Sequence, residues 1–226
     1  MKLSISAILL RLLSRATASP TPLLHHNRRL HRRRKRRLGR RIPLLCRLPT
    51  SQWHKPRQER QHDCLTVGDY DTIVTIQFDH NDQEALTLDQ YKENLVDLAT
   101  DIREFGATPI ITTPLTRRNF NGDTVKEDFV NWRLYAIDAA ESVGADYLDL
   151  TTASTDYINA IGDANAATYD LSEGDGTHIN TAGQTVFGRF VADLLLQKRG
   201  DLEEYIIFNE VLSENIWNGE YATGDE

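Results

Sequence analysis

Residues 72–78 have the sequence TIVTIQF, an almost unbroken run of β-branched and apolar side chains, and Asp79-His80-Asn81-Asp82 follows at once. Such runs are typical of strands that are buried on both faces of a parallel sheet. The polar residues would then lie at the carboxyl end of the strand, where open α/β sheets form their binding sites. This stretch therefore predicts both the fold class and the edge of the sheet that carries the site.

The rest of the chain alternates between helical and extended patterns. Two capping boxes mark helix starts, Thr87 with Gln90 and Thr181 with Gln184, and Gly106 is placed to end the first helix. Alternation of this kind predicts an α/β three-layer sandwich with a parallel sheet in a flavodoxin-like order. The predicted elements are strands at 72–78, 108–112 and 146–150, and helices at 87–105, about 126–143 and from 181 onward.

Charge divides the chain into a basic arm and an acidic body. Residues 1–64 hold 17 of the 26 Lys and Arg but only two acids, which leaves 9 basic and 31 acidic side chains for residues 65–226. We therefore predict a possible signal peptide at 1–19 and a basic segment at 20–64 that is either disordered or translated out of frame. One globular domain follows at 65–200, and a short helix with a disordered acidic tail at 201–226.

The N-terminus begins like a secretory signal, with Lys2 and then an apolar run that ends at Leu10. We expect a secreted protein, with a mitochondrial address as the alternative because the segment is rich in arginine. No stretch approaches the ~20 apolar residues that span a bilayer. No metal-ligand spacing, phosphate loop or dinucleotide motif is present, so we expect no cofactor and no metal.

A second polar cluster, Asp175-Gly176-Thr177-His178, stands in a glycine-bearing loop before the last predicted helix. An aspartate can fix the tautomer of a neighbouring histidine, and that histidine can then take a proton from a hydroxyl nucleophile. Two separate polar clusters that converge on one edge of a sheet predict an active site.

The residues around both clusters resemble a known family. The segment 76–83 resembles the third block of the SGNH (GDSL-type) hydrolases, and Asp175-Gly176-Thr177-His178 resembles their last block. The rhamnogalacturonan acetylesterases are the most similar subgroup, through Tyr70-Asp71-Thr72-Ile73-Val74, the loop at 113–118 and the continuation His178-Ile179-Asn180. The resemblance covers residues 69 to about 200.

This resemblance implies ester hydrolysis of an acetylated pectic polysaccharide by a monomer. His178 would be the general base, Asp175 would orient it, and Asn81 would donate a hydrogen bond to the oxyanion of the tetrahedral intermediate. Asp82, Arg117 and Arg118 are candidates for contacts with a sugar or a uronate.

The sequence departs from the family pattern in two places, at the first two conserved blocks and at Asp79. The G-D-S block that carries the nucleophilic serine is absent, and so is the glycine of the second block; Asp79 stands where the family has glycine. A shift of one nucleotide in compatible codons would convert Arg28–Arg32 into G-D-S-T-A and Gln52–Cys64 into N-G-I-N-Q-G-K-S-G-N-T-T-V. We therefore hypothesise that this segment is read out of frame.

Two other functions stay open at this stage. The chain could be a non-catalytic carbohydrate-binding relic of the same fold. It could also act through its basic arm on nucleic acid, although the acidic body makes nucleic acid an unexpected partner.

Overall fold

The computed structural model describes residues 42–45, 70–78 and 80–226, and for 42–45 and Tyr70 it describes the backbone alone. A parallel sheet lies at its centre, with the strand order β1-β2-β3-β6. Ile73 of β2 pairs with Thr108 of β3, and Ile110 of β3 pairs with Asp146 of β6. The strands are β1 (Ile42–Leu45), β2 (Tyr70–Ile76), β3 (Thr108–Thr112) and β6 (Asp146–Leu148).

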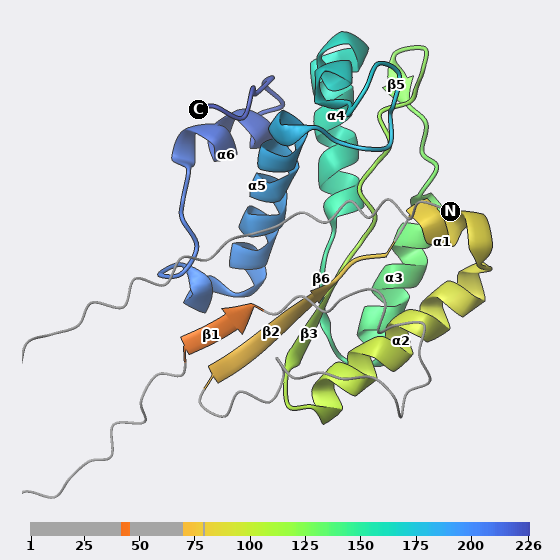
Figure 1. Cartoon of the computed structure of the whole chain (residues 1–226), viewed down its shortest axis with the longest axis vertical. Coiled ribbons are helices and arrows are strands. Elements are labelled where there is room, and N and C mark those ends of the chain that lie inside the picture. The colour runs from red at the N-terminus through yellow and green to blue at the C-terminus, as the bar shows by residue number, and fades with distance from the viewer. Residues whose placement is uncertain (1–41, 46–69, 79) are drawn as a thin grey trace, which may run out of the picture.

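Helices cover both faces of this sheet (Figure 1). The helices α2 (Leu88–Glu104) and α3 (Val130–Ser142) pack on one face, where Val74, Ile76 and Ile111 point into the core. The helix α5 (Thr181–Lys198) packs on the other face against Ile73, Ile110 and Leu148. Alternate residues of β2 and of β3 thus enter two different cores, as expected for a buried parallel strand. The predicted α/β three-layer sandwich is confirmed.

Shorter elements and one long helix complete the described chain. The helix α4 was not predicted, although Asp149 ahead of Leu150 is a favourable N-cap and marks its start. The polar residues directly after β2, for which no element was predicted, form α1. These elements are α1 (His80–Ala85), β4 (Phe120–Asn121), β5 (Thr124–Val125), α4 (Leu150–Ala166), η3 (Ala167–Tyr169), η4 (Gly200–Leu202) and α6 (Glu210–Trp217).

The two predicted capping boxes differ in outcome. At α2 the box is confirmed: the Gln90 N–H donates to Thr87 Oγ1 at 3.2 Å, and the Thr87 N–H donates to Gln90 Oε1 at 3.0 Å. At α5 the prediction of Thr181 as the cap is wrong, because Asn180 occupies that position and its Oδ1 accepts from the Gly183 N–H at 3.0 Å. The Asn180 side chain also donates to two carbonyls ahead of the helix, so it outcompetes Thr181.

A short strand, β1, lies at the edge of the sheet next to β2. Ile42–Leu45 pairs with Tyr70–Ile73 in parallel, so part of the segment that we predicted as disordered is a four-residue strand. Its sequence, IPLL, is apolar between arginine-rich flanks. A proline is tolerated there because only one side of an edge strand needs its N–H groups for pairing.

The acidic C-terminal tail is ordered, which corrects the expectation from its composition. The Glu226 carboxylate accepts from the N–H groups of Thr223 at 2.6 Å and Gly224 at 2.9 Å. The backbone of Ala222 is bonded to two buried hydroxyls, those of Tyr157 and Tyr169. The tail therefore packs back against α4 and η3, which carry Tyr157 and Tyr169. The short helix expected near 202–213 lies later, as α6.

Asp149 is expected to stabilise the fold at neutral pH and to lose this effect in acid. Its carboxylate accepts from Arg133 Nε at 2.8 Å and from the Thr152 N–H at 3.3 Å. Burial opposes ionisation, but these hydrogen bonds outweigh it and hold the pKa of Asp149 below its usual value. The stabilisation is thus present above about pH 4 and is lost as the pH falls through the lowered pKa. Asp149→Asn, which keeps a capping side chain, should cost about 1 kcal/mol at pH 7.

Urea unfolding of Asp149→Asn and of the unchanged chain at several pH values would measure this effect. The two unfolding free energies should converge below pH 4. A constant difference across that range would contradict the assignment.

Three predictions concern residues that the structure does not describe. The possible signal peptide at 1–19, most of the basic segment at 20–64 and Asp79 lie outside the described residues. In the described part, no helix is long and apolar enough to cross a membrane.

Candidate active site

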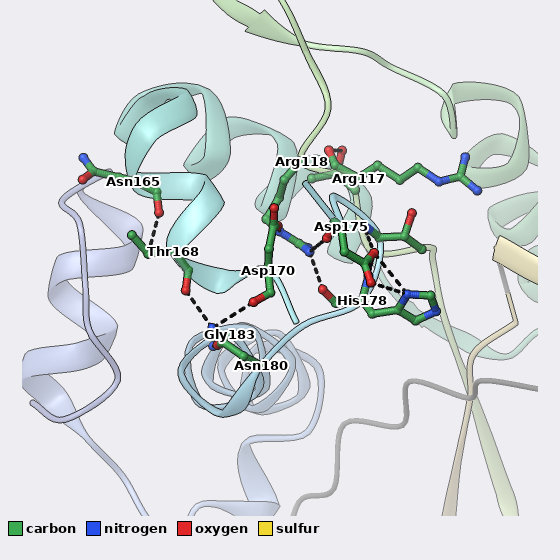
Figure 2. A network of polar contacts seen from close by, with 11 residues as sticks. Arg117, Arg118, Asn165, Thr168, Asp170, Asp175, His178, Asn180 and Gly183 are labelled. Carbon is green, nitrogen blue, oxygen red and sulfur yellow. Dashed lines mark hydrogen bonds and ion pairs between the residues drawn. The ribbon is translucent and has the colours of Figure 1, made fainter. Parts of the chain in front are cut away.

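Asp175 and His178 are in direct contact in the loop between η3 and α5, as Figure 2 shows. The His178 Nδ1 atom lies 2.8 Å from Asp175 Oδ2 and 3.1 Å from Oδ1. The side chain of His178 is 34% exposed and that of Asp175 is 24% exposed, so the pair is partly buried but accessible to solvent. The predicted pairing of these two residues is present in the structure.

The carboxylate of Asp175 is held in its ionised form. Its Oδ1 atom also accepts from the backbone N–H groups of His178 at 2.9 Å and Thr177 at 3.1 Å. Burial alone would raise the pKa of Asp175, but the hydrogen bonds from His178 and Thr177 outweigh it and lower the pKa. An ionised Asp175 accepts a hydrogen bond from the Nδ1–H of His178, and in that tautomer Nε2 carries the free lone pair that can act as a base.

The loop around the pair is fastened to its own flanks. Asp170 and Ile179 form an antiparallel bridge, and the Leu171 N–H donates to the His178 carbonyl at 3.0 Å. Asn180, next along the chain, donates its side-chain amide to the Thr168 carbonyl at 2.7 Å (Figure 2). The pair is therefore built on a short closed loop that leads straight into the cap of α5.

Arg118 occupies a structural position, which corrects the expectation that it contacts a uronate. Its side chain is 0% exposed, so no substrate group can reach it. The Nε atom donates to Asp170 Oδ1 at 2.8 Å, and Nη2 donates to the carbonyls of Asp175 at 3.1 Å and His178 at 2.7 Å. The guanidinium thus lies behind the pair instead of in front of it.

Arg117 points the other way, toward α1. Its Nη1 donates to Gln83 Oε1 at 2.5 Å and lies 3.7 Å from the Asp128 carboxylate, while its guanidinium carbon is 4.8 Å from the centre of the Phe129 ring. Its side chain is 15% exposed, so a ligand could contact only its edge. Because neighbouring arginines contact α1 and the Asp175 loop, the two polar clusters lie at the same edge of the sheet.

Asn81 and Asp82 lie in the first turn of α1, directly after β2. Asn81 is exposed, as a donor to a substrate must be, and Asp82 is half-buried. Their predicted roles rest on this placement at the carboxyl end of β2.

No hydroxyl group among residues 70–78 and 80–226 hydrogen-bonds to the His178 ring. Nor does that part of the chain bring together three or more His, Cys, Asp and Glu side chains that could hold a metal ion. The chemistry available here is that of an imidazole base fixed by a carboxylate, and the group that it would deprotonate is not supplied by these residues.

Comparisons with known proteins address the fold. No protein-family model and no curated protein matches the chain. The solved structure of YxiM from Bacillus subtilis matches with a TM-score of 0.50 and 22% identity, over 57% of this chain and 37% of that protein. The chain therefore spans little more than a third of that protein, and the match shows the α/β fold.

Two further solved structures are similar. A protein from Slackia heliotrinireducens, described as a candidate SGNH hydrolase, matches with a TM-score of 0.41 and 17% identity over 58% of this chain and 69% of its own. An acetylxylan esterase from Geobacillus stearothermophilus matches with a TM-score of 0.42 and 17% identity, over 57% and 58%.

Proposed function

We propose that this chain derives from an ester hydrolase of the SGNH type that uses Ser-His-Asp chemistry. The observation that carries the proposal is the contact between Asp175 and His178, at 2.8 Å, in a loop at the same sheet edge as Asn81. An ionised aspartate on Nδ1 leaves Nε2 free to take a proton from a serine hydroxyl. The resemblance of both segments to SGNH blocks supports the same chemistry.

The proposed reaction assigns one task to each residue. His178 Nε2 removes the proton from the serine as its oxygen attacks the acyl carbon, and the Asn81 amide donates to the resulting oxyanion. His178 then returns the proton to the departing alcohol. Water, deprotonated by the same imidazole, releases the acid and restores the serine. Asp175 stays ionised throughout and stabilises the imidazolium.

We further propose that the serine is encoded in the shifted frame of residues 20–64. The natural substrate in this proposal is an acetylated pectic polysaccharide of the rhamnogalacturonan type, and the protein is a secreted monomer. Arg117, at 15% exposure beside Gln83, and the half-buried Asp82 are the polar groups nearest to a bound sugar. The similarity of the 113–118 loop to the acetylesterase subgroup supports this substrate class.

The first experiment is to sequence the transcript across codons 15–70. Codons that yield G-D-S-T-A and the glycine block after a shift of one nucleotide support the proposal, and incompatible codons refute the frameshift. The second is to assay acetate release from a chromogenic ester by the unchanged chain and by a chain with both peptides restored. We expect activity in the restored chain and at most a trace in the unchanged one.

A second candidate function is binding without turnover. The absence of a hydroxyl on the His178 ring within the described residues favours it for the chain as written. Calorimetry with acetylated pectic oligosaccharides would then show binding by the unchanged chain, while the restored chain would release no acetate.

A further inference from the structure

Arg118 has an unusual environment for a long cationic side chain. It lies after β3, in a segment next to the loop at 170–180 that carries Asp175 and His178 and that we call the catalytic loop. Its side chain is 0% exposed. Burying an arginine is costly, and in structural terms a pair of apolar residues would often serve as well. Burial, opposed by Asp170, even lowers the pKa of the Arg118 guanidinium. The position therefore calls for a role besides stability.

The contacts of Arg118 converge on the turn that carries the pair. Its Nη2 donates to the carbonyls at both ends of the turn, Asp175 at 3.1 Å and His178 at 2.7 Å. Its backbone N–H donates to the carbonyl of Gly176, between them, at 2.8 Å. Three of the four residues of the turn are thus fixed to one arginine, as Figure 2 shows for the side-chain contacts.

Close packing adds to these hydrogen bonds. A Cβ atom on Gly176 would collide with the side chain of Asn119, so the turn and the 118–119 backbone lie against each other. The anchor of the guanidinium is the Asp170 carboxylate, at 2.8 Å from Nε, with only 7% of its side chain exposed. Asp170 thus fixes the position of the Arg118 guanidinium, which in turn restrains the carbonyls of Asp175 and His178.

One nitrogen of Arg118 indicates that this arrangement is not optimised for stability alone. Within the described part of the chain, Nη1 is buried and has no hydrogen-bond partner. Buried polar atoms without partners are rare and destabilising, and they concentrate where a geometry is needed for function. The fork instead directs Nε and Nη2 to the catalytic loop.

We propose that Arg118 is the positioning residue of the catalytic pair: it holds the Asp175 and His178 carbonyls so that the His178 ring stays on the Asp175 carboxylate. This inference rests on the proposed function, because it concerns the same pair. Lysine cannot replace it, since a single ammonium does not reproduce the planar fork that reaches a carboxylate and two carbonyls at once.

The test is NMR of the unchanged chain with ¹⁵N-labelled histidine, and it needs no esterase activity. The His178 ring signals are assigned with His178→Gln. We expect an Nδ1–H tautomer whose ring proton exchanges slowly with water. In Arg118→Lys the exchange should become at least about tenfold faster, which corresponds to about 1.4 kcal/mol of lost local stability.

Arg189→Lys is the matched control. Arg189 is also buried, at 5% side-chain exposure, pairs with Asp193 four residues on, and donates to a backbone carbonyl, that of Ile207. It lies in α5, outside the catalytic loop, so its loss should lower global stability and leave the His178 ring signals unchanged. Equal exchange in Arg118→Lys and the unchanged chain would overturn the proposal, as would equal acceleration by Arg189→Lys.

A second variant covers the case in which Arg118→Lys does not fold. Asp170→Asn weakens the anchor of Arg118 and keeps both carbonyl contacts, so it should accelerate the exchange by a smaller factor; no acceleration would overturn the proposal. The two proposals fail separately. Slow, Arg118-dependent exchange without ester hydrolysis by the restored chain refutes only the proposed function, whereas an unprotected His178 ring in the unchanged chain refutes both.

Discussion

His178→Ala, introduced into the chain with the restored serine block, will abolish acetate release. We expect a loss in kcat on the order of 10⁶-fold, because removal of one member of a cooperating triad costs about as much as removal of all of them. Among the described residues, the His178 ring is the only side chain that hydrogen-bonds to the Asp175 carboxylate, with Nδ1 2.8 Å from Oδ2. Without it the serine hydroxyl keeps its proton and is a poor nucleophile.

Asp175→Asn separates orientation from proton transfer. The shape is retained, but the amide no longer favours the tautomer with a basic Nε2, and the loss should be on the order of 10⁴-fold. Both variants should leave KM nearly unchanged, since neither side chain is assigned to substrate binding. Steady-state kinetics with a chromogenic acetate measures both parameters.

Asp138→Asn is a suitable control for these two variants. Asp138 lies on α3 with its side chain 59% exposed. It pairs with Lys92 of α2, in the layer of helices that covers one face of the sheet. Loss of this exposed pair should change kcat by less than twofold. Full activity of the His178→Ala variant would show that another base acts and would exclude the assignment.

Local signals in the sequence predicted those parts of the fold where one element is marked by its own residues. The β-branched run at 72–78 and the capping box of Thr87 and Gln90 are such signals, and both elements are present. Asp175 and His178 were predicted for the same reason: the pair is three residues apart, so the loop alone brings it together.

Features that depend on contacts between distant residues were missed or wrong. Arg118 was interpreted as a surface contact because its burial depends on Asp170, 52 residues away. The order of the C-terminal tail depends on Tyr157 and Tyr169, and its acidic composition gives no sign of these partners. Asn180 replaces Thr181 as the cap of α5 because distant carbonyls already hold its amide.

Phe187→Ala is expected to destabilise the described domain strongly. Phe187 lies in α5, is 0% exposed, and its ring packs near those of Tyr169 at 5.6 Å and Phe190 at 6.4 Å between centroids. Truncation of a buried phenylalanine costs about 3–5 kcal/mol, through lost burial and the cavity left behind. Domains of this kind have about 5–15 kcal/mol in total, so much of the population would unfold in mild denaturant.

Phe208→Ala is the matched control, because the same side chain is removed from a position that is 59% exposed. Its ring centre lies 5.3 Å from the guanidinium carbon of Arg189, and the expected cost of its removal is below about 1 kcal/mol. Urea unfolding should show a lower midpoint for Phe187→Ala at an unchanged slope. Tyr169 packs on Phe187, and the Tyr169 carbonyl accepts from the Asn180 N–H at 2.9 Å. The loop at 170–180 should therefore become less rigid in Phe187→Ala. Equal midpoints for Phe187→Ala and Phe208→Ala would show that burial of the Phe187 ring does not stabilise the domain.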